Sequence, residues 1–217
     1  MESRNRLWFD IETSPCLGWF WRPGFQTNLS YGNVIENAKI ICICYKWAGK
    51  DRVYSLTWDK NQNDKQMLKD FVAVLNSADE IIGHNSDKFD IKWIRARCAF
   101  HNIDMMPDYT TLDTLKQSRK GFNFPSHKLD SIGKYLNIGQ KLKNDADLWK
   151  RVWQNNNKSA LKEMVAYCKQ DVILLESVFN RLSKYIKPKH NIAQDRGHCP
   201  ECNSDKLQIA KRRKLSS

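Results

Sequence analysis

The chain of 217 residues contains no long hydrophobic run, and this absence excludes proteins that cross a membrane with helices. No apolar stretch approaches the roughly 20 residues that a membrane-spanning helix needs. The opening residues, MESRNR, contain no apolar segment and no cleavage site of a secretory signal. We therefore expect a soluble protein that acts in the cytoplasm and has no membrane partner.

Cysteine is present, but not in a pattern that indicates disulfide bonds. The seven cysteines are an odd number, and without a secretory signal they argue against a disulfide framework. Five of them are scattered, mostly among apolar neighbours, and we expect them to be small buried side chains: Cys16, Cys42, Cys44, Cys98 and Cys168. The sequence also contains no internal repeat.

Acidic residues are fewer than basic ones, 24 against 36, so the formal net charge is +12. The basic residues are spread along the chain. A basic globular protein attracts polyanions, and nucleic acid is the first partner to consider. From charge alone, a basic protein that binds no specific ligand is an equally good interpretation.

The pattern of apolar residues predicts an α/β fold. Strands are expected at residues 7–11, 38–47, 52–58 and 80–83, with the second and third forming a hairpin. Helices are expected at residues 64–77, 88–102, 129–136, 147–154 and 158–186, the second capped by Ser86 or Asp87 and the last ended by Pro188. Residues 13–37 are expected to be irregular, and residues 103–127 to mix turns with short elements. This order fits a mixed sheet flanked by helices.

The composition changes after Pro188, where the chain becomes polar and basic and ends in Lys211-Arg212-Arg213-Lys214. We expect one main domain at residues 1–186 and a small C-terminal appendage at residues 187–217.

Two acidic residues close the first predicted strand. Alternate residues of a strand face the same side, so Asp10 and Glu12 project together near its carboxyl end. Open α/β sheets place their sites at this edge. Neighbouring carboxylates repel each other unless a cation lies between them, and Mg²⁺ and Mn²⁺ prefer such oxygen ligands. An Asp-x-Glu pair also occurs at strand ends by chance.

Two later segments carry further acidic residues. Asp90 lies where a predicted strand ends and the next helix begins. Tyr167 and Asp171 are four residues apart, so they share one face of the last helix. Asp90 could instead be an acid favoured by the helix macrodipole, and Tyr167 and Asp171 a surface pair. The three acidic segments together, in this order, are improbable by chance.

These motifs resemble a known family. Asp10-Ile11-Glu12, Asn85-x-x-x-Phe89-Asp90 and Tyr167-x-x-x-Asp171 resemble the three motifs of the DnaQ-like, ribonuclease H-like 3′→5′ exonucleases of the subclass with tyrosine in the third motif (DEDDy). The resemblance covers residues 6–186. The motifs are similar to those of small stand-alone exonucleases of phages and bacteria, and of the proofreading domain of family B DNA polymerases. The resemblance implies a ribonuclease H-like mixed five-stranded sheet, and a phage-encoded chain would act in the host cytoplasm.

The resemblance also implies a two-metal mechanism, in which Asp10, Glu12, Asp90 and Asp171 bind two Mg²⁺ or Mn²⁺ ions. Tyr167 would orient the attacking water, because a phenol with a pKa of about 10 is a poor base at neutral pH. The expected substrate is a single-stranded 3′ end of DNA or RNA, and the product is a nucleoside 5′-monophosphate. The expected substrate contacts are Thr13, Asn85 and Phe89, with a structural role for Asn85 equally open.

Other residues have structural interpretations. His84 and His127 are expected to be structural, Asp113 to cap a helix, and Lys128 to be a solvated lysine. Between residues 13 and 37 lie five aromatic side chains, Trp19, Phe20, Trp21, Phe25 and Tyr31. We expect them mainly to pack over the sheet edge, with one ring exposed for base stacking.

The appendage contains a Cys-x-x-Cys pair, Cys199 and Cys202, next to His198. The segment resembles one knuckle of a zinc ribbon, but a structural zinc site needs four ligands. Zinc bound by His198, Cys199 and Cys202, a half ribbon completed by another chain, and a vestigial half ribbon all stay open. The basic run that follows is expected to be a disordered tail.

Two other classes of function stay open. A structure-specific endonuclease or ribonuclease would use the same fold and metals. A nucleic-acid-binding module without catalysis would use the basic surface alone, although the full set of four acidic residues argues against it. The sequence indicates no protein partner.

Overall fold

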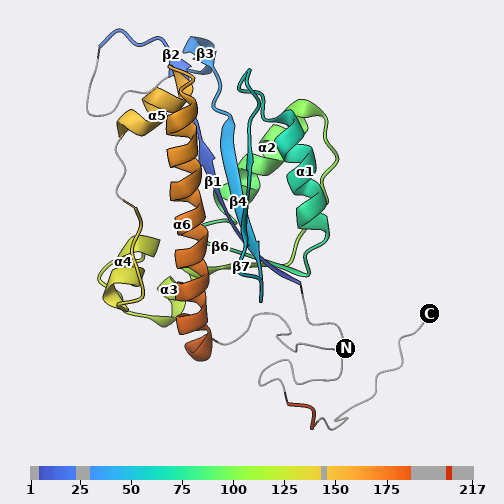
Figure 1. The fold of residues 1–217 in the computed structure, drawn as a ribbon, viewed down its shortest axis with the longest axis vertical. Coiled ribbons are helices and arrows are strands. Elements are labelled where there is room, and N and C mark those ends of the chain that lie inside the picture. Colours follow the sequence, from blue (N-terminus) through green and yellow to red (C-terminus); the bar gives the residue numbers. More distant parts are fainter. Residues whose placement is uncertain (1–4, 23–29, 143–145, 187–203, 207–217) are drawn as a thin grey trace, which may run out of the picture.

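The structure is a computed structural model, and it describes residues 5–22, 30–142, 146–186 and 204–206 (Figure 1). The expected zinc ligands His198, Cys199 and Cys202, the ring of Phe25, the residue Pro188 and most of the appendage 187–217 lie outside these residues. Among the described helices, none combines the length and the apolar character needed to cross a membrane.

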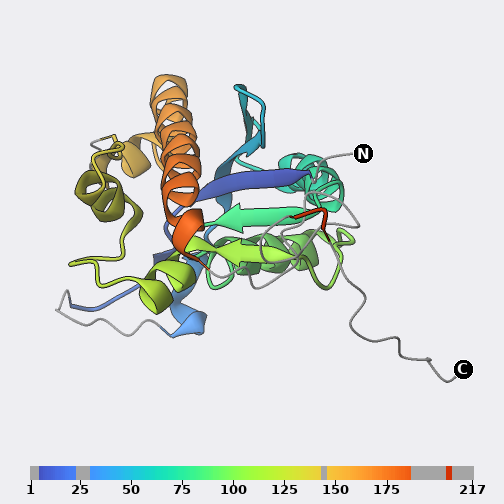
Figure 2. The same ribbon diagram turned by 90° about the horizontal axis from the view of Figure 1, so that it is seen from below.

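A mixed sheet of five strands forms the centre of the fold. In spatial order the strands are β5 (Val53–Thr57), β4 (Ile40–Trp47), β1 (Arg6–Thr13), β6 (Glu80–Gly83) and β7 (Thr111–Asp113). β4 is antiparallel to both β1 and β5, whereas β1, β6 and β7 run side by side in the same direction (Figure 2). The carboxyl ends of these three parallel strands therefore meet at one edge.

Helices cover both faces of this sheet. α1 (Lys65–Asn76) and α2 (Asp90–His101) lie on one face (Figure 1). α4 (Leu129–Tyr135), α5 (Ala146–Trp153) and the long α6 (Lys158–Leu182) lie on the other, and α3 (Thr114–Gly121) follows directly after β7. Two short 3₁₀ helices, η1 (Tyr31–Asn33) and η2 (Ser183–Tyr185), complete the described helices.

Alternation along β1 divides the core into two layers. Leu7, Phe9 and Ile11 are buried against α1 and α2, where Phe71, Leu75 and Ile94 complete the layer. Trp8 points the other way and packs with residues of α6 such as Val172 and Phe179. Because side chains alternate, Asp10 and Glu12 lie on the same side of β1 as Trp8 and face α6.

The five-stranded mixed sheet flanked by helices agrees with the ribonuclease H-like fold expected from the motifs. Three short strands were not predicted individually: β7, and the pair β2 (Leu17–Gly18) and β3 (Val34–Glu36). α3 begins directly after Asp113, the residue that was expected to cap a helix. Strands of two or three residues are too short to show an alternating pattern. α6 ends at Leu182, four residues before its predicted end, and η2 follows it.

The predicted cap of α2 is wrong. The residue before the helix is Phe89, and neither Ser86 nor Asp87 caps its amino end. Asn85 adopts a left-handed backbone conformation with φ 68°, and its carbonyl accepts hydrogen bonds from the backbone N–H of Lys88 and Phe89. This turn delays the helix until Asp90, which places the carboxylate of Asp90 in the first turn.

Two predictions of burial are also corrected. Four of the five scattered cysteines are buried, but Cys16 is exposed, because it follows the end of β1. The aromatic side chains after β1 do not pack over the sheet edge: Trp19, Phe20, Trp21 and Tyr31 are 72%, 58%, 98% and 77% exposed. β2 and β3 form a separate two-stranded sheet there, and two strands offer too little apolar surface to bury such rings.

Candidate active site

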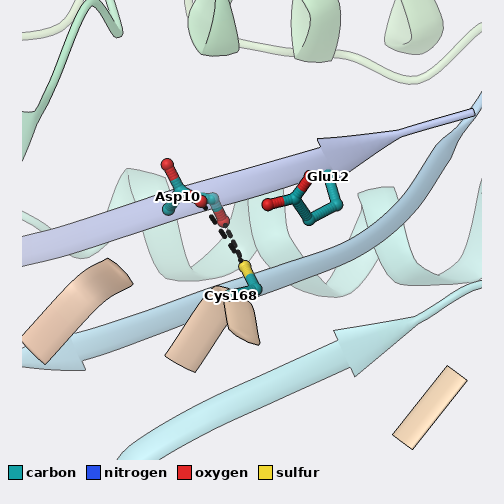
Figure 3. Close-up of side chains that lie close together, drawn as sticks. All are labelled: Asp10, Glu12 and Cys168. Atoms are coloured by element: carbon teal, nitrogen blue, oxygen red, sulfur yellow. Dashed lines mark hydrogen bonds between the residues drawn. The ribbon is translucent and has the colours of Figure 1, made fainter. Parts of the chain in front are cut away.

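Asp10 and Glu12 lie side by side on the face of β1 that α6 covers. Their partners on β4 are Cys44 and Cys42, so two carboxylates and two buried thiols occupy one patch of the sheet. Cys168 of α6 lies above this patch, and its thiol donates to the backbone carbonyl of Asp10 at 3.4 Å (Figure 3). Ligand atoms of Asp10, Glu12 and Cys168 all lie within 4.8 Å of one another.

Asp90 reaches β1 from the opposite layer. β6 pairs with β1 only as far as Trp8, which leaves the next backbone groups on that edge of β1 without a strand partner. The Oδ1 atom of Asp90 accepts a hydrogen bond from the Ile11 N–H at 3.2 Å. The side chain is 4% exposed. The turn at Asn85 and the early end of β6 thus bring the Asp90 carboxylate to the strand that carries Asp10 and Glu12.

α6 contributes Tyr167 and Asp171 from one face, as their four-residue spacing predicts. Both are buried. The ammonium group of Lys141 forms an ion pair with the Asp171 carboxylate and donates to the Tyr167 hydroxyl at 3.3 Å. The Oδ1 atom of Asp171 is buried and has no hydrogen-bond partner.

Lys141 is a site residue that the sequence analysis missed. Its backbone N–H donates to Oδ1 of Asp130 at 2.8 Å, which anchors the segment after α4. Its ammonium lies 5.3 Å from the centre of the Tyr167 ring. No motif distinguishes it from the other lysine and arginine residues of the chain, which has 36 in all, so no local signal could have identified it.

Burial and mutual repulsion raise the pKa values of the carboxylates. The pKa of Asp10 is raised well above its ordinary value by burial and by the charges of Asp90, Glu12 and Asp171. Burial, with the charge of Asp171, raises the pKa of Glu12 to about 8. Burial also raises the pKa of Asp90 to about 7. Burial and repulsion therefore favour the protonated forms of these groups unless a positive charge compensates them.

The charge of Asp171 also shifts the pKa values of Lys141 and Tyr167. Burial favours the neutral amine of Lys141, but Asp171 and Asp10 outweigh it and raise the pKa of the ammonium. Burial and the charge of Asp171 raise the pKa of Tyr167 to about 12. At neutral pH the lysine is therefore charged and the phenol is protonated.

Comparison with known proteins places the chain in a family. Residues 30–183 match the sequence model of a family described as the RNase_H superfamily. The chain belongs to the RNase H superfamily. The match includes Asp90, Lys141 and Asp171, whereas β1 with Asp10 and Glu12 lies before it. Membership supports a nuclease activity and a nucleic acid as substrate.

A solved structure shares the fold of this RNase H superfamily member. It is the family B DNA polymerase of the hyperthermophilic archaeon Pyrobaculum calidifontis, with a TM-score of 0.64 and 15% sequence identity. The similarity covers 83% of this chain and 24% of the polymerase chain, so the chain spans about a quarter of the polymerase's length. A search of curated proteins finds no match.

The residues of this site fit the divalent metals that RNase H-like nucleases generally use. Four carboxylates interact electrostatically with one lysine, Lys141, and the Oδ1 of Asp171 is a buried oxygen without a hydrogen-bond partner. Hard cations such as Mg²⁺ and Mn²⁺ prefer oxygen ligands of this kind. Burial raises the pKa of the Cys168 thiol well above its ordinary value, so the thiol stays neutral and is a poor ligand for a hard cation.

The three expected substrate contacts lie around this cluster. Thr13 ends β1, and its carbonyl accepts a hydrogen bond from Nε1 of Trp149 at 3.1 Å. Asn85 lines a cavity of about 560 Å³ together with Lys141. Phe89 is 40% exposed, and its ring centre is 6.2 Å from that of Trp93. Their positions are compatible with substrate contact, and their roles stay predictions.

The residues expected to be structural do have structural partners. His84 donates from Nε2 to the His127 carbonyl at 3.0 Å, and its Nδ1 lies 2.9 Å from the Thr114 hydroxyl. Burial lowers the pKa of His84 to about 4, so the ring is neutral. Asp113 caps α3 and also accepts from the Asn85 N–H at 2.9 Å, which links β7 to the Asn85 turn.

Proposed function

We propose that this chain is a divalent-metal-dependent 3′→5′ exonuclease that releases nucleoside 5′-monophosphates from a single-stranded 3′ end of DNA or RNA. The observation that carries the proposal is the meeting of Asp10, Glu12, Asp90 and Asp171, from three separate elements, around the last residues of β1. The order of the three acidic motifs and Tyr167 in the third one support the tyrosine-containing exonuclease subclass, DEDDy.

The four carboxylates would hold two Mg²⁺ or Mn²⁺ ions, which neutralise charge on the phosphate and lower the pKa of a bound water. The Tyr167 hydroxyl, with its pKa of about 12, keeps its proton and orients the attacking water instead of taking a proton from it. Lys141 holds Asp171 and Tyr167 in place and presents positive charge beside them.

The cavity beside Lys141 supports a binding place for a nucleotide. Its volume of about 560 Å³ lies within the roughly 300–1,000 Å³ of small-molecule sites. Arg119, Lys128 and Asn85 line it, and Asp130 is the acidic residue among its lining side chains. Lys141, the partner of Asp171, connects the cavity to the carboxylates. Phosphate groups are attracted by basic side chains of this kind.

Digestion of single strands labelled at the 5′ or the 3′ end tests the proposal. With Mg²⁺ or Mn²⁺, we expect mononucleotides from the 3′ end, and no cleavage in EDTA. Asp10→Asn and Asp171→Asn should each lower the rate by more than about 100-fold, beyond the usual effect of residues that only support metal ligands. Tyr167→Phe should slow cleavage less. Asp51→Asn, a change of the same kind at an exposed position, should keep the wild-type rate.

Other outcomes would replace the proposal. Cleavage of circular strands would identify an endonuclease on the same fold. Metal-independent binding without cleavage by pure protein would identify a binding module. Full activity of Asp10→Asn would show that the carboxylate cluster is not the catalytic site.

A further inference from the structure

An exposed aromatic surface lies directly after β1, the strand that carries Asp10 and Glu12. It consists of the side chains of Trp19, Phe20, Trp21 and Tyr31. We use the name aromatic hairpin for these four residues together with the strands β2 and β3. Trp21 is 98% exposed and Tyr31 is 77% exposed. Three of these rings are consecutive in the chain, and several exposed aromatic side chains in one short segment are a candidate interaction surface.

Backbone hydrogen bonds fix the hairpin backbone next to Trp19 and Tyr31. Leu17 pairs with Glu36 and Gly18 with Val34 across β2 and β3. The Trp19 N–H donates to the Asn33 carbonyl at 2.9 Å, so Trp19 lies opposite η1, which begins at Tyr31. The hairpin thus has a defined backbone while its aromatic side chains face solvent.

The aromatic hairpin is continuous with the candidate active site. Leu17 is only five residues after Glu12, a separation that spans at most about 18 Å of extended chain. Reciprocal hydrogen bonds between Ser14 and Lys39, at 2.8 and 2.9 Å, fix the base of the hairpin. Trp149 connects the two regions: its Nε1 donates to the Thr13 carbonyl, and its ring packs edge-on against Tyr167.

We propose that the aromatic hairpin stacks on unpaired bases of the polynucleotide whose 3′ end lies in the carboxylate site. The inference rests on the proposed function and adds the element that grips the strand upstream of the cleaved bond. Rings stack on any base through its π-face, so such a surface binds single strands without reading their sequence. The occupant is polynucleotide because the exposed surface is aromatic and joins a nuclease-like site.

Charge agrees with this occupant. Among the described residues of the hairpin, one is acidic, Glu36. Its carboxylate is paired with the Lys39 ammonium at 2.6 Å. Arg22 follows Trp21 directly and is exposed. The whole chain carries a net charge of +12. A phosphate backbone that passes the rings therefore meets no uncompensated acidic group in the described part of the hairpin.

Strand binding by the full chain in EDTA tests the inference without requiring cleavage. The probes are fluorescently labelled oligothymidylates of two and of twelve nucleotides, and a blunt duplex. Trp19→Ala, Trp21→Ala and Tyr31→Ala should each weaken binding of the twelve-nucleotide strand on the order of 10-fold. The advantage of the long over the short strand should shrink, and duplex binding should change little. Phe100→Ala, at a ring that is 70% exposed on α2, is the matched control.

Each outcome bears on one hypothesis. Variants that bind the long strand within twofold of wild type would overturn the stacking role, even if the wild type cleaves 3′ ends. Variants that weaken strand binding, in a protein that never cleaves, would support the stacking role and overturn the proposed exonuclease. If the substitutions instead abolish self-association in sedimentation and leave strand binding intact, the surface joins two copies and the inference is wrong.

Discussion

The charge balance of the carboxylate cluster depends on one lysine. The Lys141 ammonium lowers the pKa of Asp10, Glu12, Asp90 and Asp171 against the burial that raises them. Its direct partner, Asp171, is fully buried, whereas the lysine side chain is 30% exposed. Among the described residues, Lys141 is therefore the one whose positive charge compensates the buried Asp171 carboxylate when no metal is bound.

Lys141→Met is expected to destabilise the metal-free protein by about 1–3 kcal/mol, because Asp171 then loses its charged hydrogen-bond partner. Added Mg²⁺ should restore more stability to the variant than to the wild type, since a cation replaces the missing charge. Thermal unfolding with EDTA and with Mg²⁺ measures both effects. Lys46→Met serves as control, because it removes the ion pair of Lys46 with Glu176, which lies on α6 like Asp171. Mg²⁺ should not compensate for this loss. Equal stability of Lys141→Met and wild type in EDTA would contradict this account.

At the scale of elements, the close approach of α4 to α6 sets the position of Lys141. Gly133 of α4 leaves no space for a side chain: a Cβ there would lie 2.6 Å from the Gly139 carbonyl oxygen and 2.8 Å from Cδ1 of Leu174. Gly139 itself has φ +142°, a conformation that favours glycine. The two glycines let the chain turn back tightly after α4, two residues before Lys141.

Gly133→Ala should therefore push the Gly139 turn away from α4 and lower the free energy of unfolding by about 1–3 kcal/mol, the usual effect of overpacking. Activity on labelled strands should fall as well, because Lys141 shifts with the turn. Gly121→Ala is the matched control at the end of α3, where a Cβ meets nothing within 4 Å. Denaturant unfolding of both variants measures the difference. A Gly133→Ala protein as stable and active as Gly121→Ala would show that the turn is not under this constraint.

At the scale of the whole molecule, the candidate site lies where the two layers meet. Asp10, Glu12 and Asp171 belong to the layer of α6, and Asp90 comes from the layer of α2. Burial raises the pKa of Glu12 from 4.5 to about 8, and that of Asp90 from 3.8 to about 7. Without metal the folded protein thus holds protons that the unfolded chain has released. The contribution of Glu12 and Asp90 to the free energy of unfolding is therefore greatest below their unfolded pKa values and is lost as the pH rises toward 8.

Metal binding should show the opposite dependence on pH, because the carboxylates must lose their protons to bind a cation. The increase in melting temperature caused by Mn²⁺ should be small at a pH of about 5.5 and large at about 8.5. Differential scanning fluorimetry across this range, with and without Mn²⁺, measures it. Asp10→Asn should remove most of the increase. A Mn²⁺ effect that does not change with pH would mean that these carboxylates are not the ligands.

Much of the fold follows from local patterns. The strand at 80–83 is observed with the predicted bounds, and β1, β4 and β5 differ only at their ends, because each is long enough to show its period. β7 has three residues and β2 has two, so neither carries a pattern. The aromatic rings after β1 were misjudged, because burial of a side chain depends on what packs against it and not on its own type.

The sequence by itself determined that Asp10 and Glu12 share a side of one strand and that Tyr167 and Asp171 share a face of one helix. These relations follow from the geometry of a single element. Only the tertiary structure decided that Asp90 reaches the Ile11 N–H, 79 residues away, and that Lys141 pairs with Asp171, 30 residues away. Such contacts depend on where β6 ends and on how closely α4 approaches α6, which no local spacing encodes.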